Sequence, residues 1–392
     1  MKKINILTLL PVFFGFFVMG FVDVVGIATE YVKSDFSLTE QVSGYLPSVV
    51  FLWFFLLAIP SASLMNRIGR KNTVLLSMTV TLVGMIIPFI SYNIVTCFVG
   101  FALLGIGNTI LQVSLNPLVS NLVKGEMLTS SLTIGQVLKA VSSFSGPYIA
   151  LFAINQLGEW QYIFPIFALI VLLSGVWLLL TNVEREEKAK STSIKQSFTM
   201  LKNKRILLLF LGIVAVVGID VGVNMESTKL LLERLGLDPS IKENIKSVSY
   251  APSVYFFCRT IGAFIGAALL AKMDTMKYFK IHIIAALVCL VPLFFVQEEI
   301  LILVFVGLLG FTCSSIFSVI FSMAMRICPD NANEISGLMV TGIVGGAIIP
   351  PIMTNATRLF GNTQNGALCV LTLAIMYLIF LSFRIKEDKS LA

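Results

Sequence analysis

The chain has 392 residues, of which 57% are hydrophobic and 12% are charged, and its mean hydropathy is +0.93. Soluble domains carry about 25% charged residues, and a water-soluble protein this apolar would expose large adhesive patches, so the composition excludes a soluble fold and indicates lipid as the solvent. The formal charge of +7 does not indicate a nucleic-acid partner, because the basic residues lie almost entirely in short connections between apolar runs.

Since a membrane-spanning helix needs about 20 largely apolar residues, the apolar runs predict an all-α membrane protein with twelve transmembrane helices. The spans cover residues 6–32, 43–65, 72–92, 94–123, 129–155, 160–182, 205–232, 248–272, 276–296, 299–327, 334–357 and 363–384. The N-terminus reads MKKINILTLLPVFFGFFVMG, which resembles a signal peptide, but no A-x-A-like cleavage site follows, so we interpret it as part of an uncleaved first helix. Proline or charged residues interrupt the apolar runs of spans 7, 8 and 11.

The positions of lysine and arginine predict the orientation, because cytoplasmic loops hold the excess of basic residues. With both termini in the cytoplasm, the external loops hold only Lys33, Arg234, Lys242, Lys246 and Arg358. We therefore expect a multi-pass protein of the bacterial cytoplasmic (inner) membrane. The polar stretch 183–204 then forms a cytoplasmic linker between one six-helix bundle, residues 1–182, and a second, residues 205–392, which ends in a short cytoplasmic tail. Two pseudo-symmetric bundles joined in this way resemble the plan of the major facilitator superfamily.

The loop after span 2 supports this resemblance. It reads ASLMNRIGRK (62–71), which is similar to the superfamily motif G-x-x-x-D-R-x-G-R-K, with Ala62 in place of glycine and Asn66 in place of aspartate. Glycine at position 69 permits a tight turn. We expect Arg67, Gly69, Arg70 and Lys71 to form a gating loop whose cations contact helix C-terminal carbonyls and acidic partners at the cytoplasmic face.

Polar residues recur at helical spacing inside several spans, which places them on one face of each helix. Span 4 carries Asn108, Gln112 and Asn116, span 5 carries Gln136 and Lys139, span 7 carries Asp220 and Asn224, span 8 carries Arg259, and span 1 carries Asp23. Contacts between helices are the alternative explanation for the uncharged stripes.

Charges inside a membrane instead mark a cavity or a partner. The acids Asp23, Asp220 and Glu226 nearly balance the bases Lys139, Lys229 and Arg259, so we expect mutual pairing, with Glu226 and Lys229 as a surface pair near the external end of span 7.

Several patches resemble the fucose–galactose–glucose:proton symporters within this superfamily. They are GFVDVVG (20–26), LQVSLNPLVSNL (111–122), GQVLKAVSSFSG (135–146), IGAFIGAALL (261–270) and GIVGGAIIP (342–350). The resemblance implies that Asp23, Gln112, Gln136 and Lys139 line a sugar site, and that an acid of span 1 couples sugar to protons. The chain departs from the pattern at Gln112, where the family has glutamate, and at Lys139, where it has asparagine. It also has Ala263 in place of an arginine, and Phe317 in place of an aromatic hydroxyl.

These observations predict a secondary active transporter that moves a sugar, a hexose or deoxyhexose such as fucose, galactose or glucose, by alternating access and with proton coupling through Asp23 and Lys139. The expected substrate-binding residues are Asp23, Asn108, Gln112, Asn116, Gln136, Lys139, Asp220, Asn224, Arg259 and Phe317. A transporter of an acidic sugar or organic anion, held by Lys139 and Arg259, is one alternative. An uncoupled uniporter and a non-transporting sensor are two others.

An enzymatic role has no support in the sequence, which contains neither a P-loop nor a nucleophile elbow. The single histidine, His282, cannot build a metal cluster, and the six cysteines are interpreted as small apolar packing residues. We therefore expect no cofactor and no metal, and a monomer whose partners are the substrate, protons and the lipid bilayer.

Overall fold

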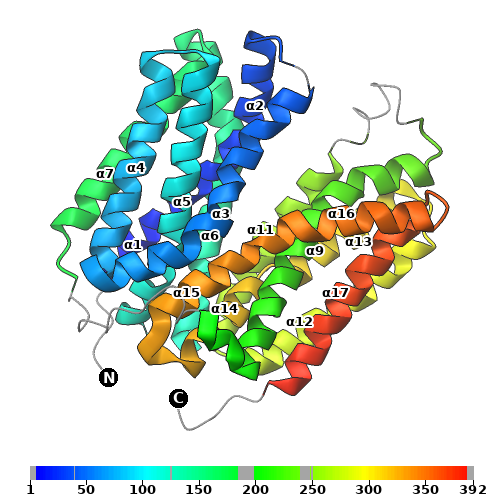
Figure 1. Cartoon of the computed structure of the whole chain (residues 1–392). Helices are drawn as coiled ribbons and strands as arrows, with labels where there is room; N and C mark the ends of the chain where they lie inside the picture. The colour runs from blue at the N-terminus through cyan, green and yellow to red at the C-terminus, as the bar shows by residue number, and fades with distance from the viewer. Residues whose placement is uncertain are drawn as a thin grey trace. The chain divides into compact units, whose positions relative to one another are not determined.

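A computed structural model describes residues 6–38, 40–123, 126–183, 198–238, 248 and 250–385 (Figure 1). Most of the predicted linker 183–204 and of the C-terminal tail lies outside these residues. The described residues are helical, without a strand, which confirms the expected all-α class. They include eleven helices long and apolar enough to cross a membrane, together with a shorter apolar helix, Leu7–Asp23, in the first predicted span.

The chain divides into two compact units. The N-terminal unit contains Met1–Lys124, Ile134–Met200 and Cys328–Thr341, and the C-terminal unit contains Gly125–Thr133, Leu201–Ile327 and Gly342–Ala392. This differs from a division at the linker by two short segments, one at the start of span 5 and one at the start of span 11.

Hydrogen bonds explain why Gly125–Thr133 belongs to the C-terminal unit and Cys328–Thr341 belongs to the N-terminal unit. Thr129 donates to Ser322 Oγ at 2.7 Å and Ser130 donates to the carbonyl oxygen of Ala267 at 2.8 Å, which joins the start of span 5 to the C-terminal unit. Ser336 donates to the carbonyl oxygen of Val113 at 2.6 Å, which joins the start of span 11 to the N-terminal unit.

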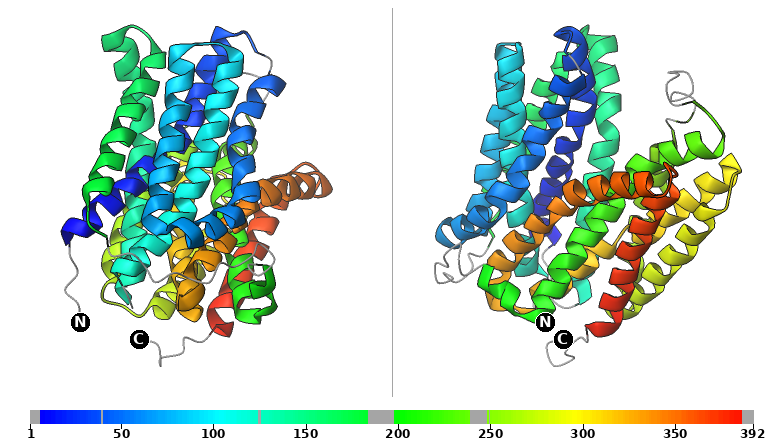
Figure 2. Two further views of the ribbon diagram at one scale, coloured as in Figure 1. Left: turned by 60° about the vertical axis from the view of Figure 1, so that its left-hand side comes forward. Right: turned by 45° about the vertical axis from the view of Figure 1, so that its right-hand side comes forward.

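The N-terminal unit is built mainly from long helices. They are α1 (Ile6–Met19), α2 (Val24–Asp35), α3 (Glu40–Ile68), α4 (Arg70–Ile90), α5 (Ile94–Leu122), α6 (Glu126–Phe152), α7 (Ile163–Leu180) and α15 (Ala332–Thr341), with the start of α6 in the other unit. Short η segments lie at Gly20–Asp23 (η1), Ala153–Leu157 (η2) and Trp160–Tyr162 (η3). Helices α4 and α5 run side by side (Figures 1 and 2). Their contact is close because a Cβ on Gly100 would lie 2.5 Å from Pro88 Cγ, so only glycine fits there.

The C-terminal unit is also built mainly from long helices. Its helices are α9 (Lys204–Arg234), α11 (Ala251–Leu270), α12 (Thr275–Leu290), α13 (Glu299–Cys313), α14 (Ile316–Ile327), α16 (Gly345–Leu359) and α17 (Asn365–Arg384), with η5 (Val291–Phe294) and η7 (Gly342–Val344). Predicted span 7, whose apolar run contains charged residues, is one uninterrupted helix. Predicted span 10, expected to be continuous, is divided at Ser314–Ser315.

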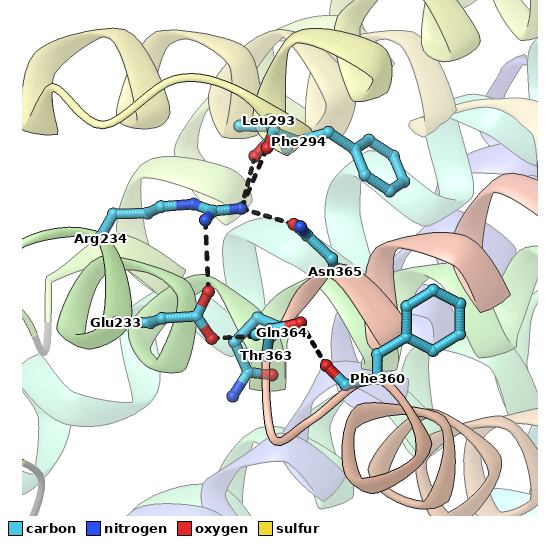
Figure 3. Close-up of polar contacts among 8 residues, drawn as sticks. All are labelled: Glu233, Arg234, Leu293, Phe294, Phe360, Thr363, Gln364 and Asn365. Carbon is cyan, nitrogen blue, oxygen red and sulfur yellow. Dashed lines mark hydrogen bonds and ion pairs between the residues drawn. The ribbon is translucent and has the colours of Figure 1, made fainter.

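A polar cluster joins three helix ends of the C-terminal unit (Figure 3). Arg234, at the end of α9, pairs with Glu233 at 3.3 Å, and its Nη2 donates to Asn365 Oδ1 at 2.6 Å and to the carbonyl oxygen of Phe294 at 3.2 Å. Glu233 Oε2 also accepts from the backbone N–H of Gln364 at 2.5 Å. Since these partners belong to η5 and to the start of α17, the cluster holds the end of α9 against both.

Candidate functional site

The first span changes helix type beside the residues predicted to bind substrate. Helix α1 ends at Met19, and a 3-10 turn, η1, carries the chain to Asp23 before α2 begins. The turn lies directly against α6, because a Cβ on Gly20 would meet the carbonyl oxygen of Lys139 at 2.5 Å. Asn108 of α5 donates its side-chain amide to the carbonyl oxygen of Met19 at 2.7 Å. Contacts from spans 4 and 5 therefore define where span 1 is interrupted.

Asp23 and Lys139 are neighbours but do not form the expected ion pair. Asp23 is exposed, and its Oδ2 accepts a hydrogen bond from Ser143 Oγ at 2.5 Å. Ser143 lies one helical turn after Lys139, about 6 Å further along α6. Lys139 is half-buried, and within the described part of the chain no carboxylate lies within 4.0 Å of its Nζ. The expectation of mutual pairing is thus wrong for these two residues, because the carboxylate turns to the serine hydroxyl.

The polar stripe on α5 is largely committed to its own hydrogen bonds. Asn108 is 2% exposed, and its Oδ1 accepts from Gln112 Nε2 at 3.0 Å. Asn116 Nδ2 donates to the backbone oxygen of Gln112 at 3.1 Å. By contrast, the side chain of Gln136 on α6 is half-buried and has no hydrogen-bond partner among the residues that the structure describes. Of the amides in the N-terminal unit that were predicted to bind substrate, Gln136 is the one whose side chain makes no hydrogen bond within the described residues.

The charged residues of spans 7 and 8 form an ion pair in the C-terminal unit. Arg259 of α11 donates from Nη2 to Asp220 Oδ2 at 2.8 Å and from Nε to Asp220 Oδ1 at 3.1 Å. Tyr255, one turn before Arg259, donates its hydroxyl to Asp220 Oδ1 at 2.5 Å. The sequence analysis did not predict Tyr255 as a site residue, although its spacing of four residues from Arg259 places both on one helix face. The expected mutual pairing is confirmed here.

The remaining predicted residues of this unit lie beside the pair or further along α9. Asn224, one turn after Asp220, is half-buried, and its side chain has no partner in the described part of the chain. Phe317 is half-buried and packs against Phe321, with ring centroids 5.7 Å apart. Lys229 pairs with Glu226 at 2.8 Å, but Glu226 is buried, so the expected surface pair is a pair with one buried partner. Within the described residues, no group of three or more metal-binding side chains is assembled.

The loop motif at residues 62–71 forms a network within the N-terminal unit. Gly69 has φ of 88°, a left-handed conformation that favours glycine, and it directly precedes α4. Lys71 Nζ donates to the carbonyl oxygens of Leu179 (2.9 Å) and Thr181 (2.8 Å), at the C-terminal end of α7. Arg70 donates to the carbonyl oxygen of Pro117 at 2.9 Å. The side chain of Arg67 is exposed.

An acidic residue that the sequence analysis missed completes this network. Glu334, at the start of α15, is 2% exposed and accepts from Asn66 Nδ2 at 2.5 Å. Asn333 donates to Asn66 Oδ1 at 2.5 Å and accepts from Arg70 Nε at 2.7 Å. The motif usually has an aspartate where this chain has Asn66. This replacement was the one sign in the sequence that another segment supplies the carboxylate. The acid comes instead from a segment far along the chain.

Comparison with known proteins gives consistent matches. The sequence profile of the Major Facilitator Superfamily matches residues 12–351. The glucose/galactose transporter of Brucella abortus is 26% identical over 355 residues, which cover 86% of this chain and 84% of that protein. The putative glucose/galactose transporter of Helicobacter pylori is 25% identical over 398 residues, which cover 95% of each chain.

Two solved structures have the same fold. The crystal structure of the fucose:proton symporter of E. coli has a TM-score of 0.82 at 17% identity and covers 99% of this chain and 100% of that one. A Major Facilitator Superfamily transporter in the outward conformation has a TM-score of 0.83 at 18% identity, with coverage of 97% and 98%. At these identities, the likeness establishes the fold alone.

Proposed function

Since this chain belongs to the Major Facilitator Superfamily, we propose that it is a secondary transporter that moves a neutral hexose or deoxyhexose across a membrane by alternating access. The names of its relatives support a sugar, because two of them are described as glucose/galactose transporters. Alternating access requires the two units to move as bodies about a substrate held within the membrane.

The chemistry of the available side chains supports a neutral sugar. Sugar hydroxyls both donate and accept hydrogen bonds, which suits side-chain amides, and an aromatic ring can pack against the apolar face of a pyranose. Gln136 and Asn224 are half-buried amides without partners in the described residues. Phe317 offers a half-buried ring. We propose Gln136 as a sugar contact of the N-terminal unit, and Asn224 and Phe317 as sugar contacts of the C-terminal unit.

A single observation carries the proposal of proton coupling. Of the acids Asp23, Asp220 and Glu226 inside spans 1 and 7, two have a cation within 4.0 Å: Asp220 has Arg259 and Glu226 has Lys229. The third, Asp23, is exposed and has a serine hydroxyl as its hydrogen-bond partner. Coupling needs a group whose proton occupancy differs between conformations, and Asp23 is the carboxylate that is free to change. Lys139, one turn from Ser143, supplies a positive charge to compensate Asp23 when it is ionised.

We place the protein in the cytoplasmic (inner) membrane of a bacterium, as a monomer with both termini in the cytoplasm. The bias of lysine and arginine toward the connections on one side supports this orientation. The relatives named above are bacterial proteins.

The proposal is tested with purified protein in sealed vesicles. A thermal-shift screen against glucose, galactose, fucose and their acidic derivatives identifies the substrate class, since binding to the folded state raises Tm. Adding the stabilising sugar outside the vesicles then drives proton uptake, recorded as alkalinisation of the external medium. We expect Asp23→Asn to bind sugar and to abolish the alkalinisation.

Each alternative has its own outcome. Stabilisation by acidic sugars alone would replace the neutral substrate with an anion. Sugar flux without alkalinisation in the wild type would identify a uniporter. Unchanged proton uptake in Asp23→Asn would remove the coupling role of Asp23 and leave the sugar transport proposal intact.

A further inference from the structure

The ion pair of the C-terminal unit lies inside membrane spans, yet it is not fully enclosed. The side chain of Asp220 is 16% exposed and that of Arg259 is 26% exposed. Two parallel N–H···O bonds join them, a bidentate arrangement with strong geometric specificity. The pair uses Nε and Nη2 of Arg259, while Tyr255 occupies the second acceptor position on Asp220 Oδ1.

The exposed edge of the pair lies on the protein-facing side of both helices. On α9, helical periodicity places Asp220 on the face of Val216, Val223 and Ser227, all buried, and opposite Leu211, which is 40% exposed. On α11, Arg259 shares a face with buried Tyr255 and Gly262, whereas Phe257 and Phe264 cover the far side at 63% and 56% exposure. Asp220 and Arg259 therefore lie on helix faces opposite the exposed apolar residues Leu211, Phe257 and Phe264. Charged residues inside membrane spans are expected to face a water-filled cavity or a partner.

The surroundings of the pair match those of a substrate contact. Asn224, proposed above as a sugar contact, lies one turn from Asp220 on α9. Tyr255 packs closely against α13, because a Cβ on Gly310 would lie 2.6 Å from the Tyr255 backbone oxygen and 2.9 Å from its ring. A sugar that contacts Asn224 would therefore lie one helical turn from Asp220, whose partner Arg259 already has its positive charge neutralised.

We propose that Asp220 determines the charge selectivity of the transporter: by neutralising Arg259, it allows neutral sugars to bind and excludes acidic ones. This inference rests on the proposed sugar transport and goes beyond it, because it assigns the rejection of sugar acids to one residue. A guanidinium binds carboxylates in a bidentate fashion, and Asp220 already occupies that face of Arg259. A uronate would have to displace Asp220 and leave a carboxylate uncompensated in the membrane. A neutral sugar needs no such exchange.

Opposite substitutions in the pair predict opposite changes in selectivity. Asp220→Asn leaves Arg259 uncompensated and replaces the strong acceptor with an amide of the same size. Glucuronate should then bind about tenfold to a hundredfold more tightly than it binds wild type, the range for a hydrogen-bonded charge. Arg259→Gln leaves Asp220 uncompensated and should increase the affinity for glucosamine, a cationic sugar, by a similar factor. The double variant Asp220→Asn/Arg259→Gln should show neither gain.

The experiment measures the Kd of glucose, glucuronate and glucosamine for purified full-length protein in detergent, by thermal shift and by competition with labelled glucose. The matched control is Glu226→Gln, which removes another acid of α9 that also pairs with a cation, Lys229. We expect no change in sugar-charge selectivity for this control. Wild type should bind glucose at least about tenfold more tightly than glucuronate, given the strength of a charged hydrogen bond.

Several results would overturn the inference. Comparable affinity of wild type for glucose and glucuronate is one. A second is a folded Asp220→Asn variant whose affinity for glucuronate does not increase. A third is an increase in this affinity that persists in the double variant. If Asp220→Asn does not fold, the absence of a glucosamine gain in Arg259→Gln is decisive. A wild type that binds glucose while neither variant gains its charged sugar refutes the selectivity role alone. A wild type that binds no sugar refutes the proposed function as well.

Discussion

Asn108 of α5 donates its side-chain amide to the backbone oxygen of Met19, 2.7 Å away, at the residue where span 1 changes from an α-helix to a 3-10 turn. A change of helix type inside a membrane leaves backbone groups without their regular partners, and in lipid each of these is costly. Asn108 satisfies one of them. The side-chain oxygen of Asn108 in turn accepts a hydrogen bond from Gln112 Nε2, so the polar stripe of α5 supports the turn that carries Asp23.

We expect Asn108→Ala to lower stability and transport together. The substitution leaves Met19 O and Gln112 Nε2 without their partner, at a cost of about 1–2 kcal/mol, and it releases the turn that positions Asp23. Tm in detergent and sugar uptake in vesicles measure the two effects. The control is the neighbouring Thr109→Val, which removes only a bond within α5 to Gly105 O. Equal losses of Tm in both variants would contradict the role of Asn108.

The close contact of Gly20 with α6 gives a second prediction. A Cβ at this position would meet Lys139 O at 2.5 Å and Ser142 Cβ at 2.6 Å, and both belong to a packed helix that cannot yield easily. Gly20→Ala should therefore cost about 1–3 kcal/mol through overpacking and lower Tm. In the control Gly175→Ala, the new methyl group would lie 3.7 Å from Met78 Sδ, an ordinary contact. A Gly20→Ala protein as stable as this control would show that the two helices separate freely.

Much of the fold could be predicted from the sequence, because spans depend on local apolar length. The helical class and the positions of most spans follow from runs of about 20 apolar residues. The interruption of span 1 could not be predicted, because it depends on Asn108 and on the backbone of Lys139, which are distant in the sequence. Similarly, nothing near Ser314–Ser315 distinguishes a divided span 10 from a continuous one.

For the candidate site, the sequence could predict which residues share a helix face but not which partners they have on other helices. Spacing places Gln136 with Lys139, and Asp220 with Asn224, on shared faces. Partners across helices are a matter of tertiary packing, so the carboxylate of Asp23 was assigned to Lys139, although it bonds to Ser143. Glu334 lies 268 residues from its partner Asn66, and periodicity carries no information over such a distance.

The cluster around Arg234 should hold the C-terminal unit together (Figure 3). Arg234→Ala leaves Glu233 without its cation and removes the bonds to Asn365 and to the carbonyl oxygen of Phe294. For a partly buried cluster we expect a loss of about 1–3 kcal/mol, seen as a lower Tm. Arg358→Ala is the control, since this arginine is exposed at the end of α16. If the two alanine variants unfold at the same temperature, the cluster does not contribute to stability.

The buried hydroxyl of Tyr92, in the connection between α4 and α5, should make the protein less stable at alkaline pH. Burial raises the pKa of Tyr92 well above its ordinary value, and the hydrogen bond of its hydroxyl to Asp35 Oδ2 at 2.6 Å adds to this. In the unfolded chain tyrosine ionises near pH 10. The stabilising contribution is therefore present below about pH 10 and lost as the pH rises further, because the unfolded state then releases the proton first. Between about pH 9 and 11, Tm of wild type should fall more steeply than Tm of Tyr92→Phe. Parallel slopes would contradict this.

Lys139 should be retained for transport and not for stability. It lies inside span 5 without a carboxylate within 4.0 Å in the described part of the chain, and such a charge is costly in a membrane. Lys139→Met, with similar length and no charge, should therefore leave Tm unchanged or raise it. Sugar-driven proton uptake should fall at least about tenfold, because the charge that compensates ionised Asp23 is gone, a loss equivalent to about 1.4 kcal/mol. Lys139→Arg, which keeps the charge, should retain part of the uptake. If Lys139→Met transports normally at every pH while Tm drops, the lysine serves the fold, and Asp23 works without it.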